Sequence, residues 1–284
     1  MLRRRTVAIV QGRMNSSRLP GKILLDLVGR PMLEHVLERA RRARSLDQVV
    51  MATTTDPSDD PVETFCRAKG YPVFRGDMFD VLDRFYQAAR QFEAGIVVRI
   101  TADCPVIDPA LIDMTVQVLQ SPDAGRKPAV DFSCNRLPPP WKRTFPIGLD
   151  VEVCTFAALE CAWQKADQKF HREHVMPYFY EGVVFSETSI PLNTRDHSMQ
   201  TGISPRGFCI AQLHHDPDYG AMRWTVDTPE DLEVMRSVLA RFDRDDFSWQ
   251  DVLALQESEP EIFAINAAVE HKTAFDVDER QKKD

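Results

Sequence analysis

Residues 10–22, "VQGRMNSSRLPGK", form the first stretch of the sequence whose side chains could do chemistry. Arg13, Arg18 and Lys22 are spaced so that they can surround several phosphates, and Gly12 lets the backbone approach a ligand closely. The apolar run "TVAIV" directly precedes this stretch and is typical of a buried parallel strand. The composition of this strand-end loop favours a phosphate or nucleotide site, and the alternative is a structural turn with exposed arginines.

The loop does not match the two common phosphate-binding motifs. A P-loop would need glycine where Ser16 stands and serine or threonine where Ile23 stands. The dinucleotide fingerprint needs three closely spaced glycines, and the loop has only Gly12 and Gly21. What remains is a cradle of three cations, to which the hydroxyl groups of Ser16 and Ser17 could add hydrogen-bond donors.

Two aspartates further along the sequence are candidate ligands of a metal ion. Asp103 ends the run "GIVVRITAD", and Asp227 lies in "TVDTPEDL", just before a predicted helix. A nucleoside triphosphate needs a hard cation such as Mg²⁺, which one or two carboxylates bind together with the substrate phosphates. Each aspartate also has a structural interpretation, Asp227 as favourable charge at a helix N-terminus and Asp103 as a turn residue.

The first 120 residues alternate between short apolar runs and amphipathic segments, which predicts strands alternating with helices. This order implies right-handed crossovers and a mostly parallel sheet with helices on both faces. Ligands of such sheets bind at the carboxyl ends of the strands, and the first and fourth strands end in "QGR" and "TAD". The predicted strands are 6–10, 48–53, 71–76 and 95–103, and the predicted helices begin at Pro31 or span 59–70, 80–92 and 108–120.

The alternation weakens between residues 121 and 225 and becomes regular again after them. A strand, a tight turn and a helix are predicted over 222–242, with Thr228 as the N-cap and Asp231 completing a capping box. We further expect a strand at 146–153, helices at 156–166, 172–180 and 248–258, and a charged tail at 276–284.

Composition limits the class of protein. The 284 residues are 43% hydrophobic, enough for one substantial core and a smaller appendage. No apolar run approaches the ~20 residues that cross a bilayer, so we expect a cytoplasmic protein without membrane contact. The net charge of −8 argues against nucleic-acid binding, although residues 1–44 carry eleven Lys or Arg against three Asp or Glu and could serve a small polyanion. Six scattered cysteines without a C-x-x-C pair favour reduced thiols over zinc or disulfides.

The motifs together resemble the cytidylyltransferase family, which includes CMP-KDO and CMP-sialic acid synthetases, and most of all its spore-coat-polysaccharide type. The resemblance starts with "QGRMNSSRLPGKIL" and covers roughly residues 6–240. Gly12 replaces the alanine common in that loop. The matching motifs occur in the family's order, as "ATTTDPSDD", "VFRGDMFDVLDRFYQAA", "VVRITADCPVIDP", "GLDVEV", "REHVMPYFY" and "TVDTPEDL".

This resemblance implies a fold, an activity and an assembly. The fold would be α/β, a three-layer Rossmann-like, mostly parallel sheet of the nucleotide-diphospho-sugar transferase type, which is GT-A-like. The nucleotidyltransferase domain would span 1–245, with an acceptor-binding and dimerisation subregion at about 134–222, followed by a C-terminal extension at 246–284. The activity would be Mg²⁺- or Mn²⁺-dependent transfer of the cytidylyl group of CTP to a sugar acid such as a 2-keto nonulosonate, with release of pyrophosphate, in a homodimer.

The resemblance also implies roles for individual residues. Asp103 and Asp227 would bind the metal ion, and Arg13, Lys22 and Asp103 would be catalytic. Nucleotide binding would fall to Gln11, Gly12, Arg13, Ser17, Arg18, Lys22, Thr53, Arg75, Asp80 and Arg99, and acceptor binding to Asn135, Glu152, Arg172 and His174. Arg75 and Arg99 could equally be ion-pair partners, and His174 a satisfied histidine on a helix. Ile147 stands where relatives often have a basic residue, which argues against a basic acceptor contact there.

Three other functions stay open at this point. The same fold could use a sugar phosphate or a phosphonate as acceptor. A nucleotide-sugar-dependent glycosyltransferase usually carries a D-x-D motif at a strand end in the middle of its sequence, whereas "DPD" at 216–218 and "DVD" at 276–278 lie in a predicted loop and in the tail. A non-catalytic nucleotide sensor would not need both aspartates and all three loop cations.

Overall fold

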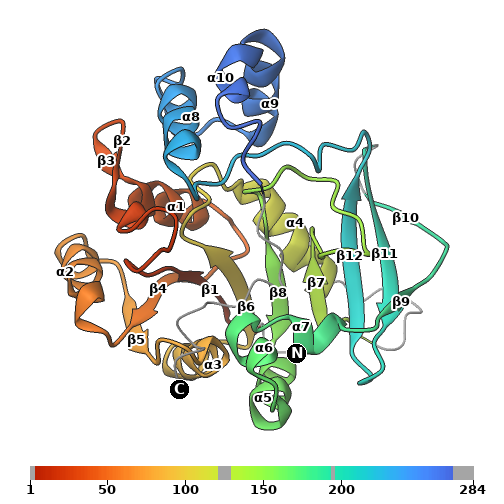
Figure 1. The fold of residues 1–284 in the computed structure, drawn as a ribbon. Coiled ribbons are helices and arrows are strands. Elements are labelled where there is room, and N and C mark those ends of the chain that lie inside the picture. Colours follow the sequence, from red (N-terminus) through yellow and green to blue (C-terminus); the bar gives the residue numbers. More distant parts are fainter. Residues whose placement is uncertain (1–3, 121–128, 193–195, 271–284) are drawn as a thin grey trace.

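A ten-stranded mixed sheet forms the centre of the protein in the computed structural model, which describes residues 4–120, 129–192 and 196–270 (Figure 1). Across the sheet the strands are β10 (Ile190–Pro191), β11 (His197–Ile203), β12 (Cys209–His215), β7 (Phe132–Cys134), β8 (Glu152–Thr155), β6 (Ile96–Thr101), β1 (Thr6–Gln11), β4 (Gln48–Thr54) and β5 (Val73–Gly76), and β9 (Val184–Phe185) pairs with β11. A separate ribbon pairs β2 (Asp26–Leu27) with β3 (Arg30–Pro31).

The two halves of the sheet differ in strand direction. β5, β4, β1 and β6 all run parallel, as βαβ units require. β8 then lies antiparallel to both β6 and β7, and beyond β7 the long hairpin of β11 and β12 closes the sheet. The predicted α/β class, with a mostly parallel sheet, is confirmed.

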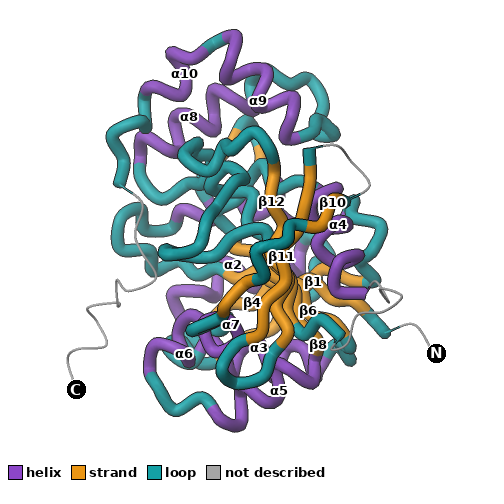
Figure 2. Tube along the Cα trace, turned by 90° about the vertical axis from the view of Figure 1, so that its right-hand side faces the viewer, coloured by secondary structure: helices purple, strands orange, loops and turns teal. Residues whose placement is uncertain are grey.

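Helices cover both faces of the sheet and make three layers (Figure 2). One face carries α1 (Met32–Arg41), α2 (Asp60–Ala68), α4 (Pro109–Gln120) and α8 (Pro229–Leu239), with α9 (Trp249–Ser258) and α10 (Pro260–Ala264) beside α8. The other face carries α3 (Val81–Gln91), α5 (Phe156–Lys165), α6 (Lys169–His174) and α7 (Pro177–Tyr180). Short 3₁₀ turns lie at Lys22–Leu24 and Pro57–Asp59.

The packing of both faces of β1 explains why residues 7–10 are all apolar. Ala8 and Val10 pack into the core beneath α1 and α4, whereas Val7 and Ile9 pack into the core on the α3 and α5 side. Successive side chains of a strand point to opposite faces, so a strand covered by helices on both sides needs no polar residue. The polar residues begin only where β1 ends, at the edge where the opening loop starts.

Most predicted elements of the first half are confirmed, and the differences lie in the second half. The expected strand at 146–153 is wrong in its first part, since β8 begins at Glu152 and an isolated bridge joins Ile147 to Arg223. The strand predicted before Asp227 is also absent, because Arg223 forms only this isolated bridge. The helix expected at 172–180 is divided into α6 and α7 at Val175, whose φ is 66°. The predicted tail at 276–284 lies outside the described residues.

The C-terminal helices are integrated with the main sheet. Trp249, the first residue of α9, is buried and its amide donates to the Asp108 carboxylate (2.8 Å) ahead of α4. The indole of Trp224 donates to Gln256 of α9 (2.7 Å). No helix in the described part of the protein is both long and apolar enough to cross a membrane.

Candidate active site

Hydrogen bonds to a neighbouring segment and a glycine turn fix the conformation of the opening loop. The amide of Met14 donates to Asp59 (2.7 Å), and the carboxamide of Asn15 donates to the Ser58 hydroxyl (2.9 Å), which ties the loop to the segment that leads into α2. Gly21 takes a φ of 73° where the backbone turns into the 3₁₀ turn that begins at Lys22. A side chain there would be strained, so the glycine directs Lys22 back under the sheet edge.

The structure shows a reason for glycine at position 12 that the sequence did not indicate. A Cβ at this position would lie 2.6 Å from the Cβ of Ala102, at the end of the neighbouring strand β6. The ends of β1 and β6 therefore approach so closely that an alanine at this position would force one of them to shift. Gly12 also lines a cavity, as the prediction of close approach to a ligand requires.

Lys22 joins the two predicted metal ligands. Its ammonium lies 2.7 Å from an oxygen of Asp103 and 2.9 Å from an oxygen of Asp227, and it also donates to the carbonyl of Val226 (2.8 Å). Burial alone would lower the pKa of Lys22, but the two carboxylates raise it above the ordinary value. The opening loop and the two aspartates, 81 and 205 residues from the lysine, thus meet at one point.

Asp227 is surrounded by cations. Its second oxygen lies 2.8 Å from Arg18 and 3.0 Å from Arg223. Burial alone would raise the pKa of Asp227, but Lys22, Arg18 and Arg223 hold it well below the usual range. The capping role expected at this helix is performed by Thr228 with Asp231, as predicted, so the carboxylate of Asp227 is directed to the cations instead.

The two aspartate loops also bond to each other through the backbone. The amide of Val226 and the hydroxyl of Thr225 both donate to the carbonyl of Asp103, at 2.9 and 3.0 Å. Gly148, with a φ of 108°, packs against this loop so tightly that a Cβ would lie 2.7 Å from the backbone of Trp224. The positions of Asp103 and Asp227 are therefore set by main-chain contacts around them.

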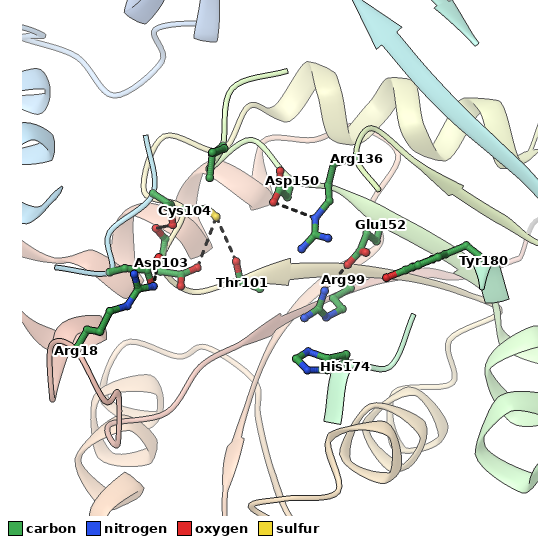
Figure 3. Close-up of a pocket in the computed structure, with 14 residues that line it drawn as sticks. Arg18, Arg99, Thr101, Asp103, Cys104, Arg136, Asp150, Glu152, His174 and Tyr180 are labelled. Atoms are coloured by element: carbon green, nitrogen blue, oxygen red, sulfur yellow. Dashed lines mark hydrogen bonds and ion pairs between the residues drawn. The ribbon is translucent and has the colours of Figure 1, made fainter. Parts of the chain in front are cut away.

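A cavity of about 230 Å³ opens beside these aspartates, and we call it the aspartate cavity (Figure 3). It extends from Asp103 and Asp227 across the sheet to β8, and charged or polar groups form most of its wall. Its lining residues are Arg18, Arg99, Thr101, Asp103, Cys104, Arg136, Ile147, Gly148, Asp150, Glu152, His174, Tyr180, Thr225 and Asp227.

A second cavity of about 180 Å³, the arginine cavity, lies next to the opening loop. Cations and apolar groups dominate its wall: Gln11, Gly12, Arg13, Met78, Phe79, Val81, Arg84, Arg99, Glu173 and His174. Arg84 is almost fully buried, at 1% exposure, and its Nε has no hydrogen-bond partner in the described part of the protein. Burial and the nearby Arg13 lower the pKa of Arg84 to about 10.

Arg99 and His174 line both cavities and so form the wall between them. Arg99 pairs with Glu152 and donates to the Gln11 side chain (3.3 Å), which is the ion-pair role left open by the sequence. The pKa of His174 is lowered to about 4 by burial and by the positive charges of Arg99 and Arg136. Its Nε2 is buried without a described partner, so a neutral imidazole with an available nitrogen lies between the cavities.

Five of the predicted nucleotide-binding residues line neither cavity: Lys22, whose contacts with the aspartates are described above, and Ser17, Thr53, Arg75 and Asp80. Ser17 is exposed on the loop, and Thr53 is buried with its hydroxyl donating to Asp59 (2.8 Å). Arg75 is fully engaged elsewhere, with the carbonyls of residues 54 and 56 and with acidic side chains at 60 and 63. Asp80 caps α3 through the amide of residue 83 (2.9 Å) and pairs with Arg172. In the structure these side chains support the loops around the arginine cavity.

Two predicted acceptor residues are placed differently from the expectation. Arg172 pairs with Asp80 and donates to the carbonyl of Trp163 (2.8 Å), so it connects α6 to α3 outside the aspartate cavity. Asn135 is fully buried, and its side-chain amide bonds only the backbone of Leu149 and Val151. Glu152 and His174, the other two, do line the cavity.

Several lining residues were not identified from the sequence. Arg84 was assigned only to the amphipathic pattern of its helix, and Arg136 and Asp150 lie in an irregular segment with no spacing signal. Arg223 forms two 2.8 Å contacts with Asp231 and one with Asp227. The run "MRWTVDTPED" offered one clue, because it carries Asp227 and Asp231 close to Arg223 in the sequence.

The arrangement fits a hard divalent cation. Asp103 and Asp227 both reach one ammonium nitrogen, so their oxygens converge on a single position for positive charge. Across residues 4–120, 129–192 and 196–270 there is no cluster of three or more His, Cys, Asp or Glu that could hold a metal. Two carboxylates without further protein ligands suit Mg²⁺, which usually keeps waters and substrate phosphates in its shell.

Comparison with known proteins places the chain in a family. The cytidylyltransferase family profile matches residues 7–201. A cytidylyltransferase structure from Leptospira borgpetersenii superposes with a TM-score of 0.77 at 30% identity, covering 95% of this chain and all of the other. The chain therefore belongs to the cytidylyltransferase family and is a nucleotidyltransferase.

Curated relatives can be aligned with this chain over most of its length. The chain is 33% identical over 276 residues to an uncharacterised protein of Methanocaldococcus jannaschii, covering 96% of this chain and 99% of that protein. It is 28% identical to the spore coat polysaccharide biosynthesis protein SpsF of Bacillus subtilis, covering 89% and 94%. It is also 28% identical to a 3-deoxy-manno-octulosonate cytidylyltransferase of Anaeromyxobacter dehalogenans, covering 84% and 98%.

Proposed function

We propose that this protein is a CMP-sugar synthetase that transfers the cytidylyl group of CTP to a sugar acid and releases pyrophosphate. The acceptor we favour is a 2-keto nonulosonate of the sialic, legionaminic or pseudaminic type, made for a surface polysaccharide. Mg²⁺ or Mn²⁺ is the proposed cofactor, and a homodimer the proposed assembly. The family membership and the names of the two functionally described relatives support this proposal.

The observation that carries the proposal is the convergence of Lys22, Asp103 and Asp227. A cation from the opening loop and one carboxylate from each half of the fold meet at the edge of the aspartate cavity. Phosphoryl transfer consists mainly of positioning and charge stabilisation. A site with loop cations on one side and metal-binding carboxylates on the other provides both.

The reaction needs a nucleophile in line with the leaving group. A hydroxyl oxygen of the sugar acid attacks the α-phosphorus of CTP, the bond to the β-phosphate oxygen breaks, and the hydroxyl proton is released to solvent. Arg18 and Lys22 would neutralise the departing pyrophosphate. Bound at Asp103 and Asp227, Mg²⁺ would supply further charge stabilisation at the α-phosphate. The neutral His174 could accept a hydrogen bond from the attacking hydroxyl.

The arginine cavity is the proposed place of the base. Met78, Phe79 and Val81 offer an apolar surface for a flat ring, while Arg13 and Arg84 offer N–H donors. Cytosine presents two acceptors, its carbonyl oxygen and its unprotonated ring nitrogen, to such donors. A base in this cavity and an acceptor in the aspartate cavity would be separated by the wall of Arg99 and His174, with the triphosphate running along the opening loop.

Pyrophosphate release tests the proposal. Four nucleoside triphosphates are each combined with sugar acids, sugar phosphates and phosphonates, with and without Mg²⁺. The proposal expects release only with CTP, a sugar acid and the metal ion. Release with a sugar phosphate in place of the acid, or transfer from a preformed nucleotide sugar, would contradict it.

A further inference from the structure

Arg136 lies at the wall of the aspartate cavity on a segment fixed by its neighbour. It follows β7 by two residues, and the preceding Asn135 accepts from the amide of Val151 (2.9 Å) and donates to the carbonyl of Leu149 (2.7 Å). These two bonds hold the segment beside β8, so the backbone of Arg136 has little freedom. Its side chain is 23% exposed and lines the cavity.

The guanidinium of Arg136 is only partly used by the protein. Its Nε donates to Asp150 at 3.3 Å, and neither terminal nitrogen donates to a residue within the described ranges. Figure 3 shows this group directed into the cavity, toward Arg99 and Glu152. An arginine fork with two available N–H-bearing nitrogens matches the two oxygens of a carboxylate.

Most charged groups in the wall of the aspartate cavity are already paired with one another, so Arg136 is the cation that could bind an anionic acceptor. Asp150 is already held by both terminal nitrogens of Arg143, and Glu152 is paired with Arg99. At the opposite end, Lys22 and Arg18 pair with the metal-binding aspartates. Among the described residues that line this cavity, Arg136 is thus the cation whose two terminal nitrogens both form no hydrogen bond.

Ile147 gives this arginine a specific purpose. Its apolar side chain lines the same cavity as Arg136. An isoleucine cannot bind an anion, so the basic contact must come from another segment if the acceptor is acidic. The available guanidinium of Arg136 provides that charge from β7's side of the cavity.

We propose that Arg136 is the acceptor-specificity residue of this protein and binds the carboxylate of the sugar acid through its two terminal nitrogens. This inference rests on the proposed function, since it assumes that the acceptor lies in the aspartate cavity. Asn135 acts through Arg136 as a positioning residue. Asp150 orients the guanidinium through its Nε, which leaves the fork free for the substrate.

The test compares turnover and binding of acceptors with and without a negatively charged carboxylate. Pyrophosphate release from CTP is followed with sugar acids, including N-acetylneuraminate and 3-deoxy-manno-octulosonate, and with the primary amide of each acid. Wild type, R136Q, R136K and the control R244Q are compared, because Arg244 is an exposed arginine on the α8–α9 connection. Binding of each acid in the presence of Mg²⁺ and a non-hydrolysable CTP analogue is measured by calorimetry.

The expected result is a substrate-specific loss. R136Q should raise KM for the acid about 30-fold and leave KM for CTP unchanged, R136K should lie in between, and R244Q should match wild type. Wild type should prefer the acid over its amide by a similar factor, and R136Q should have lost this preference. Should R136Q fail to fold, the role of Arg136 is judged from the preference for acid over amide in wild type and in R136K, which should be smaller in R136K.

Other outcomes distinguish this inference from the proposed function. Turnover of an acid with equal KM in wild type and R136Q overturns the role of Arg136 and leaves the synthetase activity standing. Turnover only with sugar phosphates or neutral acceptors overturns both. If no acid turns over or binds, the carboxylate role of Arg136 is also overturned, whatever the nucleotide binding shows.

Discussion

The two cavities on either side of Arg99 and His174 differ in how their charges are balanced. In the aspartate cavity nearly every carboxylate already faces a cation of the protein, as Asp227 faces Lys22, Arg18 and Arg223. In the arginine cavity a buried Arg84 keeps an unbonded Nε beside Arg13. The first region holds paired charges that the proposed metal ion would have to rearrange, and the second holds positive charge that an electron-rich ligand would balance.

This difference suggests a division of work. The Nη1 of Arg84 donates to the carbonyl of Asp77 (2.7 Å), but its buried Nε has no described partner. A buried and incompletely bonded charge is costly, so a ligand that accepts from this guanidinium would stabilise the arginine cavity. The ion-paired aspartates are stable by themselves, and Lys22 holds them together in the free protein. The predictions below alter one side at a time.

The largest effect is expected on the aspartate side. Asp103→Asn removes one of the two carboxylates that converge on the metal position while keeping the size and the backbone contacts of the loop. Mg²⁺-dependent turnover should fall at least about 1,000-fold, with the thermal unfolding midpoint close to that of wild type. Near-normal turnover would remove Asp103 from the metal site.

Replacing Lys22 tests whether it holds the aspartates together. Lys22→Met leaves Asp103 and Asp227 without their common ammonium, and breaking a buried ion pair should lower the free energy of unfolding by about 3 kcal/mol. Millimolar Mg²⁺ should restore part of this loss, measured by urea unfolding. Lys69→Met, at a half-exposed pair with Glu34, is the control and should change little. If Lys22→Met unfolds like the control, the ammonium is not structural.

Replacing Arg84 tests the arginine side. Arg84→Met should weaken CTP binding about 10- to 100-fold, measured by calorimetry, and leave KM for the acceptor unchanged. Because the buried guanidinium keeps one hydrogen bond, to the carbonyl of Asp77, and leaves its Nε unbonded, the free protein should lose no more than about 1.5 kcal/mol of stability. A parallel loss of stability and CTP affinity would instead mark Arg84 as a structural residue.

The smallest effect concerns pH. The folded protein holds the pKa of His174 at about 4, below the ordinary 6.5, so between these values the unfolded state binds more protons. The contribution of His174 is therefore fully present above pH 6.5 and is lost as the pH falls toward 4. His174→Gln should unfold with a flatter pH dependence between 7 and 4.5. Identical curves would contradict a buried neutral imidazole.

The first half of the fold could be predicted because its signals are local. Strands buried on both faces read as apolar runs, and Gly70 ends α2 with a φ of 73°, as expected of a glycine after a helix. The second half depends on long-range pairing, such as β12 with β7, β6 with β8, and Ile147 with Arg223. Such strand pairing leaves no local pattern. The break at Val175 does leave one, because Pro177 begins α7 two residues later.

The candidate site was predictable to a similar extent. Arg13, Arg18, Lys22, Asp103 and Asp227 belong to compact motifs, and each lines a cavity or belongs to the ion-pair cluster at Asp227. Arg84 and Arg136 become recognisable only when the fold shows that their N–H groups lack partners. Conversely, Arg75 and Arg172 belong to family motifs, yet their guanidinium groups are engaged by neighbouring acidic side chains.

A crystal structure with Mn²⁺ and a non-hydrolysable CTP analogue tests the central claim most directly. We expect a manganese anomalous peak at a coordination distance of about 2.1 Å from oxygens of both Asp103 and Asp227. The ammonium of Lys22 should have moved from these carboxylates to the triphosphate, and the base should lie against Arg84. Lys22 still bridging the two aspartates, with manganese bound elsewhere or only to phosphates, would contradict it.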